Sequence, residues 1–260
     1  VPGPGALNAT AALGTAFASS SPVMLISGQI ESYNLGLNRG ALHEIGEQLD
    51  VFKHLTKWCG RTTESSEIPA LVHRAMKELS TGRPRPVEIE VPWDILPTQT
   101  EIELLEQEVH PKKRPEPAHV RSAAEALAHA QRPLIWAGGG AREADLSPEL
   151  LELAQVLNAP VITTPEGKGA FPEDNPLSLG TIYNGHGPGH HVVPQADVIL
   201  AVGSRMHMVP PVDWSPKPHQ TLIQIDADPE EVGRNIPVTT GMAADGRLAL
   251  QDLLAELGGK

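Results

Sequence analysis

The feature that most constrains the fold of this 260-residue chain is an alternation of short apolar runs with segments of helical periodicity. Short apolar runs are typical of buried parallel strands, and helices between them are the usual crossover connections. The pattern predicts an α/β fold with doubly wound, mainly parallel sheets. Helices are expected at 6–17, 67–79, 120–130, 147–158 and 245–257, and strands at 22–27, 87–91, 133–137, 161–164, 198–202 and 222–225.

A proline-rich segment divides the chain. Pro111, Pro115 and Pro117 fall close together, and proline cannot continue a helix. The charge changes at the same place, because −8 of the net charge of −12 falls within 119–260. We therefore predict a partial α/β domain over 1–97, a linker over 98–118 and a complete Rossmann-like domain over 119–260.

Composition narrows the classes of function. The chain has 20 basic and 32 acidic residues, a balance opposite to that of a general nucleic-acid binder. Its apolar runs are shorter than the roughly 18 residues that a membrane span needs. Cys59 is the one cysteine, so an internal disulfide is excluded and a reducing, cytoplasmic location is favoured.

Small and polar residues follow each predicted strand of the second domain. In doubly wound sheets, ligands bind at the carboxyl ends of the strands, so these residues are candidates for a binding site. They are Gly138-Gly139-Gly140, Thr163-Thr164, Gly203-Ser204-Arg205 and Asp226-Ala227-Asp228.

Each of these motifs has two interpretations. The triple glycine either approaches a phosphate or makes a tight turn, and Glu143 departs from the full dinucleotide fingerprint. Asp226 either binds ribose hydroxyls or belongs to a helix cap, with Asp228 as the better cap and Pro229 as the first helical residue. Arg205 either meets a phosphate or pairs with a surface carboxylate.

Other polar residues give weaker indications. His186, His190 and His191 lie in a glycine-rich loop without the cysteines of many zinc sites, which favours a solvated loop over a metal centre. His43 has no partner close in sequence that would define a catalytic triad. Cys59 follows Trp58 in an apolar stretch, which favours a buried structural thiol over a nucleophile.

Taken together, the motifs resemble a known family. The turn Gly3-Pro-Gly-Ala-Leu-Asn8, the stretch Leu55-Thr-Lys-Trp58 and the stretch Val91-Pro-Trp-Asp-Ile-Leu96 occur in the family's order. So do Arg132-Pro-Leu-Ile-Trp-Ala-Gly-Gly-Gly and Ile225-Asp-Ala-Asp-Pro-Glu-Glu-Val-Gly-Arg-Asn. The chain is similar to thiamine-diphosphate-dependent enzymes such as acetolactate synthases, benzaldehyde lyases and benzoylformate or oxalyl-CoA decarboxylases.

The resemblance covers about one and a half of the family's three domains. Residues 1–97 resemble the second half of the pyrimidine-binding domain, and 119–260 resemble the central domain. The family's cofactor-activating glutamate and its Gly-Asp-Gly…Asn motif for magnesium and diphosphate have no counterpart in the sequence. We therefore expect a fragment of a larger enzyme that is inactive alone, with no metal ligand of its own.

The resemblance also implies site residues. Gly3, Pro4, Gly5 and Asn8 are expected near thiamine diphosphate, and His43 and Gln48 near the substrate. In the central domain, FAD or ADP is implicated at Gly138, Gly139, Gly140, Thr164, Gly203, Ser204, Arg205 and Asp226. Met206-His207-Met208 departs from the stretch that flavin-binding members carry after the arginine, and Pro92-Trp93-Asp94 is closer to the lyase branch.

The resemblance implies a lyase or synthase that decarboxylates 2-oxo acids or forms carbon–carbon bonds, with a 2-oxo acid or aldehyde as substrate. The parent enzyme is expected to need magnesium and to form a homodimer or homotetramer. An alternative is a non-catalytic module that binds ADP or FAD through 119–260. An NAD-dependent oxidoreductase would rest on sheet topology alone.

Overall fold

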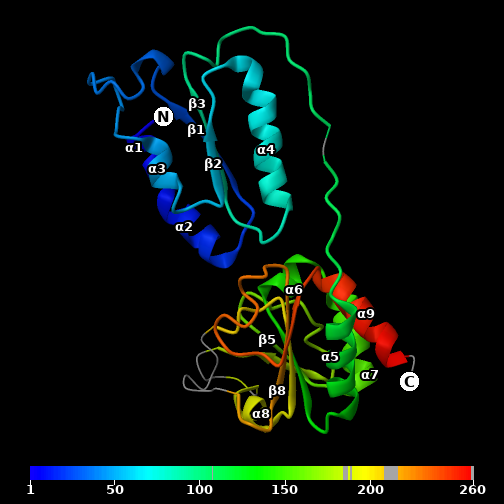
Figure 1. Ribbon diagram of the computed structural model, residues 1–260. Coiled ribbons are helices and arrows are strands. Elements are labelled where there is room, and N and C mark those ends of the chain that lie inside the picture. The colour runs from blue at the N-terminus through cyan, green and yellow to red at the C-terminus, as the bar shows by residue number, and fades with distance from the viewer. Residues whose placement is uncertain (107, 184–186, 188, 208–215, 259–260) are drawn as a thin grey trace. The chain divides into compact units, whose positions relative to one another are not determined.

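The computed structural model describes residues 1–106, 108–183, 187, 189–207 and 216–258. Internal contacts divide the chain into two units, Val1–His110 and Pro111–Lys260, each with its own sheet (Figure 1). The division falls inside the segment 98–118, which was predicted to be a linker. Among the described residues, no helix has the length and apolar character needed to cross a membrane.

The sheet of the first unit has three parallel strands in the order β1-β3-β2. Two of them were expected from their apolar runs. The third, β2, was missed because it has only four residues and Gly60 and Arg61 interrupt its apolar character. The strands are β1 (Met24–Gln29), β2 (Trp58–Arg61) and β3 (Val87–Pro92).

Helices cover both faces of this sheet (Figure 1). On one face, Leu71 and Ala75 of one long helix pack against Val87 and Ile89. On the other face, shorter helices bring a small cluster around Phe52. The central strand β3 is therefore buried along its whole length. The helices are α1 (Pro4–Leu7), α2 (Thr10–Ser19), α3 (Gln48–Phe52) and α4 (Ile68–Ser80), with 3₁₀ turns at Ser32–Asn34 and Ser65–Glu67.

The predicted helix 6–17 is wrong in one respect, because it is two helices. Helix α1 ends at Leu7, Asn8 caps it, and α2 starts at Thr10. Proline at the first position of α1 is compatible with a helix start, since its missing N–H would have had no partner there. The break leaves Asn8 exposed at the end of α1.

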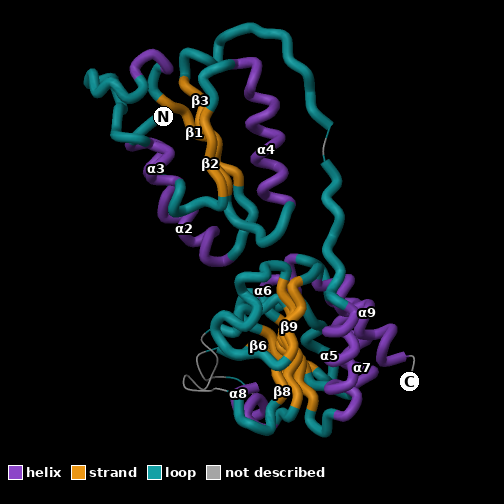
Figure 2. Tube along the Cα trace, viewed as in Figure 1, coloured by secondary structure: helices purple, strands orange, loops and turns teal. Residues whose placement is uncertain are grey.

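The second unit has a six-stranded parallel sheet in the order β6-β5-β4-β7-β8-β9 (Figure 2). Four strands were predicted. The two edge strands were missed because each is short and contains a glycine. The strands are β4 (Pro133–Ala137), β5 (Val161–Thr163), β6 (Ser178–Thr181), β7 (Val198–Val202), β8 (Thr221–Asp226) and β9 (Thr240–Ala243).

The helices of this unit pack on the sheet through an extensive apolar core that includes Leu150, Leu200 and Leu250. A smaller core around Trp136 covers the opposite face. The helices are α5 (Pro117–His129), α6 (Gly139–Glu143), α7 (Ser147–Leu157), α8 (Gly189–Val192) and α9 (Gly246–Gly258), with a 3₁₀ turn at Val193–Gln195. Pro117, which was counted with the linker, is the first residue of α5.

The chain starts this sheet at β4, extends it through β5 and β6 to one edge, and returns to add β7, β8 and β9 on the other side. This is the strand order of the classic doubly wound fold, and the direction reverses between β4 and β7. The carboxyl ends of these two strands are Ala137 and Val202, so the glycines that follow them lie at the reversal point.

The helix predicted to begin at Pro229 is absent, because residues 229–233 form turns. The Asp226 carboxylate accepts a hydrogen bond from the Asp228 N–H (2.9 Å), and Asp228 accepts one from the Glu230 N–H (3.0 Å). Gly233 then bends back, with φ of 73°, and its N–H reaches Gln224 Oε1 on β8 (2.8 Å). These local bonds satisfy the backbone without a helix.

Candidate functional site

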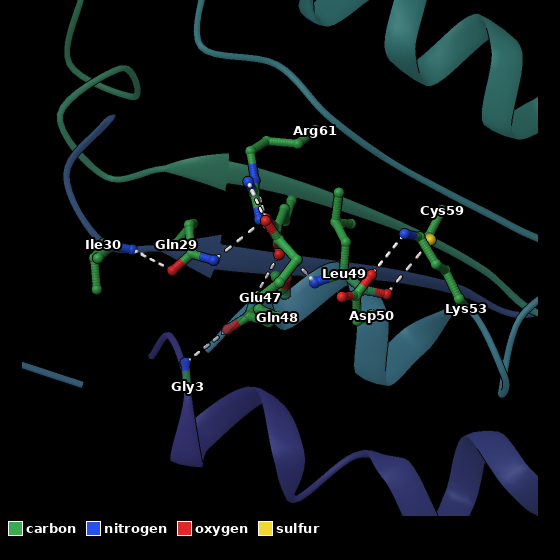
Figure 3. A network of polar contacts seen from close by, with 12 residues as sticks. Gly3, Gln29, Ile30, Glu47, Gln48, Leu49, Asp50, Lys53, Cys59 and Arg61 are labelled. Atoms are coloured by element: carbon green, nitrogen blue, oxygen red, sulfur yellow. Dashed lines mark hydrogen bonds and ion pairs between the residues drawn. The ribbon is translucent and has the colours of Figure 1, made fainter. Parts of the chain in front are cut away.

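A buried polar network lies on the face of the first sheet that is covered by the short helices (Figure 3). Alternate residues of a strand point to the same face. Two of the strands therefore each contribute a pair of polar side chains two positions apart, and the third contributes one side chain at its end. The contributors are Ser27 and Gln29 from β1, Arg61 from β2, Glu88 and Glu90 from β3, and Gln48 from α3. Of these, all but Arg61 are buried.

Gln48 connects this network to the N-terminal turn. Its side chain is completely buried. Its Oε1 accepts a hydrogen bond from the Gly3 N–H (2.7 Å), as Figure 3 shows. Its Nε2 donates to Glu90 Oε2 (2.7 Å) and lies 3.1 Å from both Ser27 Oγ and the Gly28 carbonyl. Gln48 therefore fixes the turn to the sheet.

Glu90 is the charged centre of the network. Its carboxylate accepts hydrogen bonds from Arg61 Nε, from Gln48 and from Gln29 Nε2 (3.3 Å). Burial raises the pKa of Glu90, and the Arg61 guanidinium opposes that shift. Arg61 also pairs with Glu47, whose pKa it lowers. Because a guanidinium faces Glu90, we assign the negative charge of the buried pair to this residue.

Glu88 is the neutral member of the pair. It is fully buried, and Ser27 Oγ donates to its Oε1 (2.6 Å), whereas Oε2 has no hydrogen-bond partner among the described residues. Burial, together with the nearby charge of Glu90, raises the pKa of Glu88 to about 8, although Ser27 and Arg61 oppose the shift. Glu88 is therefore mostly protonated at neutral pH, next to an ionised Glu90.

Sequence reasoning assigned Val87–Val91 to a buried strand but did not single out its glutamates. A signal was present in the alternation Val-Glu-Ile-Glu-Val. In a central parallel strand with helices on both faces, both sets of alternating residues are buried. Two glutamates in such a strand must be neutralised, paired or hydrogen-bonded.

The structure brings several predicted residues of the first unit together. Gly3 has φ of 51°, and a Cβ built on it would lie 2.1 Å from the His43 carbonyl oxygen. Gly3 thus lies between Gln48 and the backbone of His43. The His43 side chain is exposed and its φ is 69°. Pro4 and Asn8 are also exposed, one helical turn apart, while Gly5 packs against Val1.

In the second unit, two of the glycines predicted to contact a phosphate, Gly138 and Gly140, lie against the loop that follows β7. The N–H groups of Gly138 and Gly140 donate to the carbonyls of Val202 (2.9 Å) and Gly203 (3.0 Å). A Cβ on Gly138 would lie 2.2 Å from the Gly203 oxygen, and one on Gly139 would lie 3.0 Å from Glu166 Cβ. The close approach of two loops accounts for these glycines, which favours the tight-turn interpretation.

Other residues predicted for the site of this unit form hydrogen bonds within the protein. Thr164 Oγ1 accepts from the Gly167 N–H (3.0 Å), and Ser204 Oγ accepts from the Met206 N–H (3.2 Å). The Arg205 carbonyl accepts from Asn235 Nδ2 (2.8 Å). With Asp226, these residues surround the reversal point between β4 and β7, where a nucleotide would bind in this topology.

A cavity and a pair of histidines lie outside the two groups of residues described above. A cavity of about 680 Å³ lies between α4 and the segment 95–110, with a lining that includes Ile68, Val72 and Leu105. Among the described residues, no group of three or more His, Cys, Asp or Glu side chains could hold a metal ion. His190 and His191 stack edge to face at 5.3 Å, and His186 lies outside the described residues.

Comparison with known proteins identifies the class to which this chain belongs. The family model for the central domain of thiamine pyrophosphate enzymes matches residues 120–253. The model for their N-terminal cofactor-binding domain matches residues 1–51. The chain therefore belongs to the thiamine pyrophosphate enzyme family.

Individual relatives agree with this assignment. The chain is 36% identical to a probable acetolactate synthase large subunit of Methanocaldococcus jannaschii, over 98% of the chain and 44% of that protein. It is 33% identical to a probable 2-ketoarginine decarboxylase of Pseudomonas aeruginosa, over 99% of the chain and 46% of that protein. The chain thus spans less than half the length of these relatives.

A solved structure supports the fold. The crystal structure of benzoylformate decarboxylase from Polynucleobacter necessarius matches with a TM-score of 0.81 at 24% sequence identity. The match covers 98% of this chain and 48% of that protein. The same arrangement of elements is therefore found in an enzyme of low sequence identity.

We expect Gly203→Ala to destabilise the second unit. Gly203 has φ of 57°, and a Cβ there would lie 2.4 Å from the Ala141 nitrogen. Left-handed strain and the overlap together should cost about 3 kcal/mol. Native-state hydrogen exchange of the β4 and β7 amides measures this loss.

Gly169→Ala is the matched control. Gly169 also has a positive φ, 90°, but a Cβ there would have no other atom within 4 Å, so only the strain of about 1 kcal/mol should appear. Equal losses for the two variants would contradict the assigned role of the contact between the two loops.

We expect the stability of the first unit to fall as the pH rises from about 5 to about 9, mainly because of Glu88. The pKa of Glu88 in the folded chain is about 8, compared with 4.5 for an ordinary glutamate. The stabilisation is thus present at low pH and is lost as the pH rises through about 8. Hydrogen exchange of the β3 amides, corrected for intrinsic rates, measures it.

Glu88→Gln removes the titrating group and keeps the acceptor for Ser27. The pKa of Glu90 is also raised, so its titration makes stability depend on pH with the same sign, and both proteins retain this dependence. The difference between wild type and variant therefore isolates Glu88. Identical pH dependence in the two proteins would show that Glu88 does not hold a proton in the folded chain.

Proposed function

We propose that this chain carries part of the cofactor site of a thiamine-diphosphate-dependent enzyme that decarboxylates 2-oxo acids or forms carbon–carbon bonds next to a carbonyl. The observation that carries the proposal is the match of two family models in order along the chain. Relatives named as acetolactate synthase, 2-ketoarginine decarboxylase and sulfoacetaldehyde acetyltransferase support the class of reaction. When bound, the cofactor supplies stabilisation of a carbanion at the carbonyl carbon of the substrate.

The turn at Gly3 fits a contact with the neutral pyrimidine part of the cofactor. Gly3 is buried and held on two sides, while Pro4 and Asn8 are exposed on one face of α1. An amide and a tight backbone turn offer hydrogen bonds and apolar contact without a charge. The exposed His43 side chain, next to this turn, is the residue that we propose for contact with the substrate.

The remaining parts of the proposal concern partners. The substrate is a small 2-oxo acid or aldehyde, and the complete enzyme is a homodimer or homotetramer in a reducing, cytoplasmic setting. Magnesium would bind together with the cofactor diphosphate, and no residue of this chain is proposed as its ligand.

The direct test uses the full coding sequence that contains these 260 residues. The purified protein should release CO₂ from pyruvate or a related 2-oxo acid only when thiamine diphosphate and Mg²⁺ are both present. Asn8→Ala should raise the KM for thiamine diphosphate by about tenfold, because one hydrogen bond of ordinary strength is lost. Turnover that is independent of added cofactor, after its complete removal, would contradict the proposal.

A second function is favoured by the strand order of the second unit. The reversal point between β4 and β7 is the place where doubly wound sheets bind nucleotides, and Arg205 and Asp226 lie there. We propose ADP or FAD as the ligand. Because Gly138 and Gly140 use their N–H groups within the protein, side chains would provide the contacts with phosphate and ribose.

Isothermal titration of the 260-residue chain with ADP and with FAD tests this second function. We expect heat with one of them, and a loss of about tenfold in affinity for Arg205→Ala, as for a charged hydrogen bond. Arg142→Ala, which removes an exposed arginine paired with Glu143, is the control. Absence of heat with both ligands would exclude the nucleotide site.

A further inference from the structure

The turn at Gly3 has little freedom of its own. Its positive φ and the close approach of the His43 carbonyl oxygen exclude any residue with a Cβ. Its N–H is buried and points to Gln48 Oε1. Loss of that acceptor would leave a buried donor unpaired, so the position of the turn depends on the Gln48 amide.

The Gln48 amide has a single possible orientation. The Gly3 N–H can only donate, and an ionised Glu90 can only accept. Gln48 therefore presents its oxygen to Gly3 and its nitrogen to Glu90, over 2.7 Å in each case. A reversed amide would place two donors against each other at one end and two acceptors at the other.

Glu90 is in turn held from two strands. Gln29 and Arg61 donate to it, and Arg61 continues to Glu47 at the start of α3. The chain of contacts runs from a partly exposed ion pair, through a buried carboxylate and an amide, to the backbone of the turn. Each member has a charged or hydrogen-bonded partner, which gives the turn one position.

We propose that Gln48 is a positioning residue for the cofactor-facing turn Gly3–Gly5, and that Glu90 orients its amide. This inference rests on the proposed function for the role of the turn. It replaces the substrate contact predicted for Gln48, because its side chain is completely buried and both ends of its amide are bound to the protein.

Amide hydrogen exchange in the chain labelled with ¹⁵N-glycine tests the positioning bond without any activity. Gln48→Met keeps the length of the side chain and removes both hydrogen-bonding ends. The protection factor of the Gly3 amide should fall by about tenfold or more, in line with one buried hydrogen bond. Unchanged protection of Gly3 would overturn the proposal.

The second unit provides a matched control variant that is measured in the same way. Gln224 is also buried, its Oε1 accepts from the Gly233 N–H (2.8 Å), and its Nε2 donates to the Ser204 carbonyl (3.0 Å). Gln224→Met should reduce the protection of Gly233 and leave Gly3 unchanged. A loss at Gly3 in this variant would mean that the measurement reports general destabilisation, and the proposal would then lack its specific effect.

Gln48→Glu makes the link dependent on pH, which a purely steric role would not do. When protonated, the introduced carboxyl group can accept from Gly3 and donate to Glu90, as the glutamine amide does. When ionised, it faces Glu90 and Glu88 on β3. The other nearby charged groups are Arg61 on β2 and Glu47 at the N-cap of α3. The ionised group can still accept from Gly3, but repulsion by Glu90 would move it away from that position. Gly3 protection should therefore be near that of wild type at low pH and fall more steeply than in wild type as the pH rises. The wild-type protein measured over the same pH range supplies the slope that Glu88 and Glu90 cause on their own, and a loss of Gly3 protection no steeper than in wild type would contradict the proposed link to Glu90.

The kinetic test uses the enzyme expressed from the full coding sequence. Gln48→Met should raise the KM for thiamine diphosphate by about tenfold, with kcat at saturating cofactor changed much less. A fall in kcat with an unchanged KM for the cofactor would indicate contact with the substrate and overturn the positioning role. If the wild-type protein does not use thiamine diphosphate, the proposed function fails, while Gly3 protection still reports on the positioning bond.

Discussion

The burial of two glutamates in the central strand of the first sheet is the constraint on which this unit depends. A carboxylate without partners is costly to bury, so each glutamate must be neutral or paired. The structure uses both solutions two residues apart, with Glu88 protonated and Glu90 bound to Arg61. The positions of Ser27, Gln29 and Gln48 follow, because they supply the donors that these two groups need.

The second unit meets a different constraint with a different device. The ends of β4 and β7 approach so closely that Gly138 and Gly203 have no room for a side chain. Here the backbone itself provides the polar contacts, from the N–H groups of Gly138 and Gly140 to facing carbonyls. The glycine pattern that is typical of phosphate-binding loops is thus also a requirement of loop packing, and these N–H groups cannot serve both purposes.

Much of the fold could be predicted from periodicity. The helices α4, α7 and α9 and the strands β4 and β7 are long or strongly apolar, and the structure confirms them. Strand β2 and the edge strands could not be found in this way, because partners in the sheet stabilise them rather than their own apolar character. The helix expected after Asp228 failed because hydrogen bonds of the Asp226 and Asp228 side chains compete with helix formation.

The candidate site was predictable to a different extent. Motif resemblance brought Gly3, His43 and Gln48 together in the prediction, and the structure places them side by side. Motif resemblance could not separate the roles of His43 and Gln48, because the sequence does not show which of these two polar side chains is buried. Burial and partners distinguish them, since only the structure shows that the Gln48 amide is bound at both ends.

This difference has a physical consequence for the choice between catalysis and positioning. For Gln48 to reach a substrate, its nitrogen would have to leave Glu90 and its oxygen would have to leave Gly3. That movement would leave a buried carboxylate with one donor fewer and a buried N–H with no acceptor, and each loss costs on the order of 1–3 kcal/mol. A substrate contact would have to exceed both losses, whereas a positioning role requires neither. The environment of Gln48 therefore favours a fixed side chain that shapes the turn, with His43 as the member of this pair whose side chain is exposed.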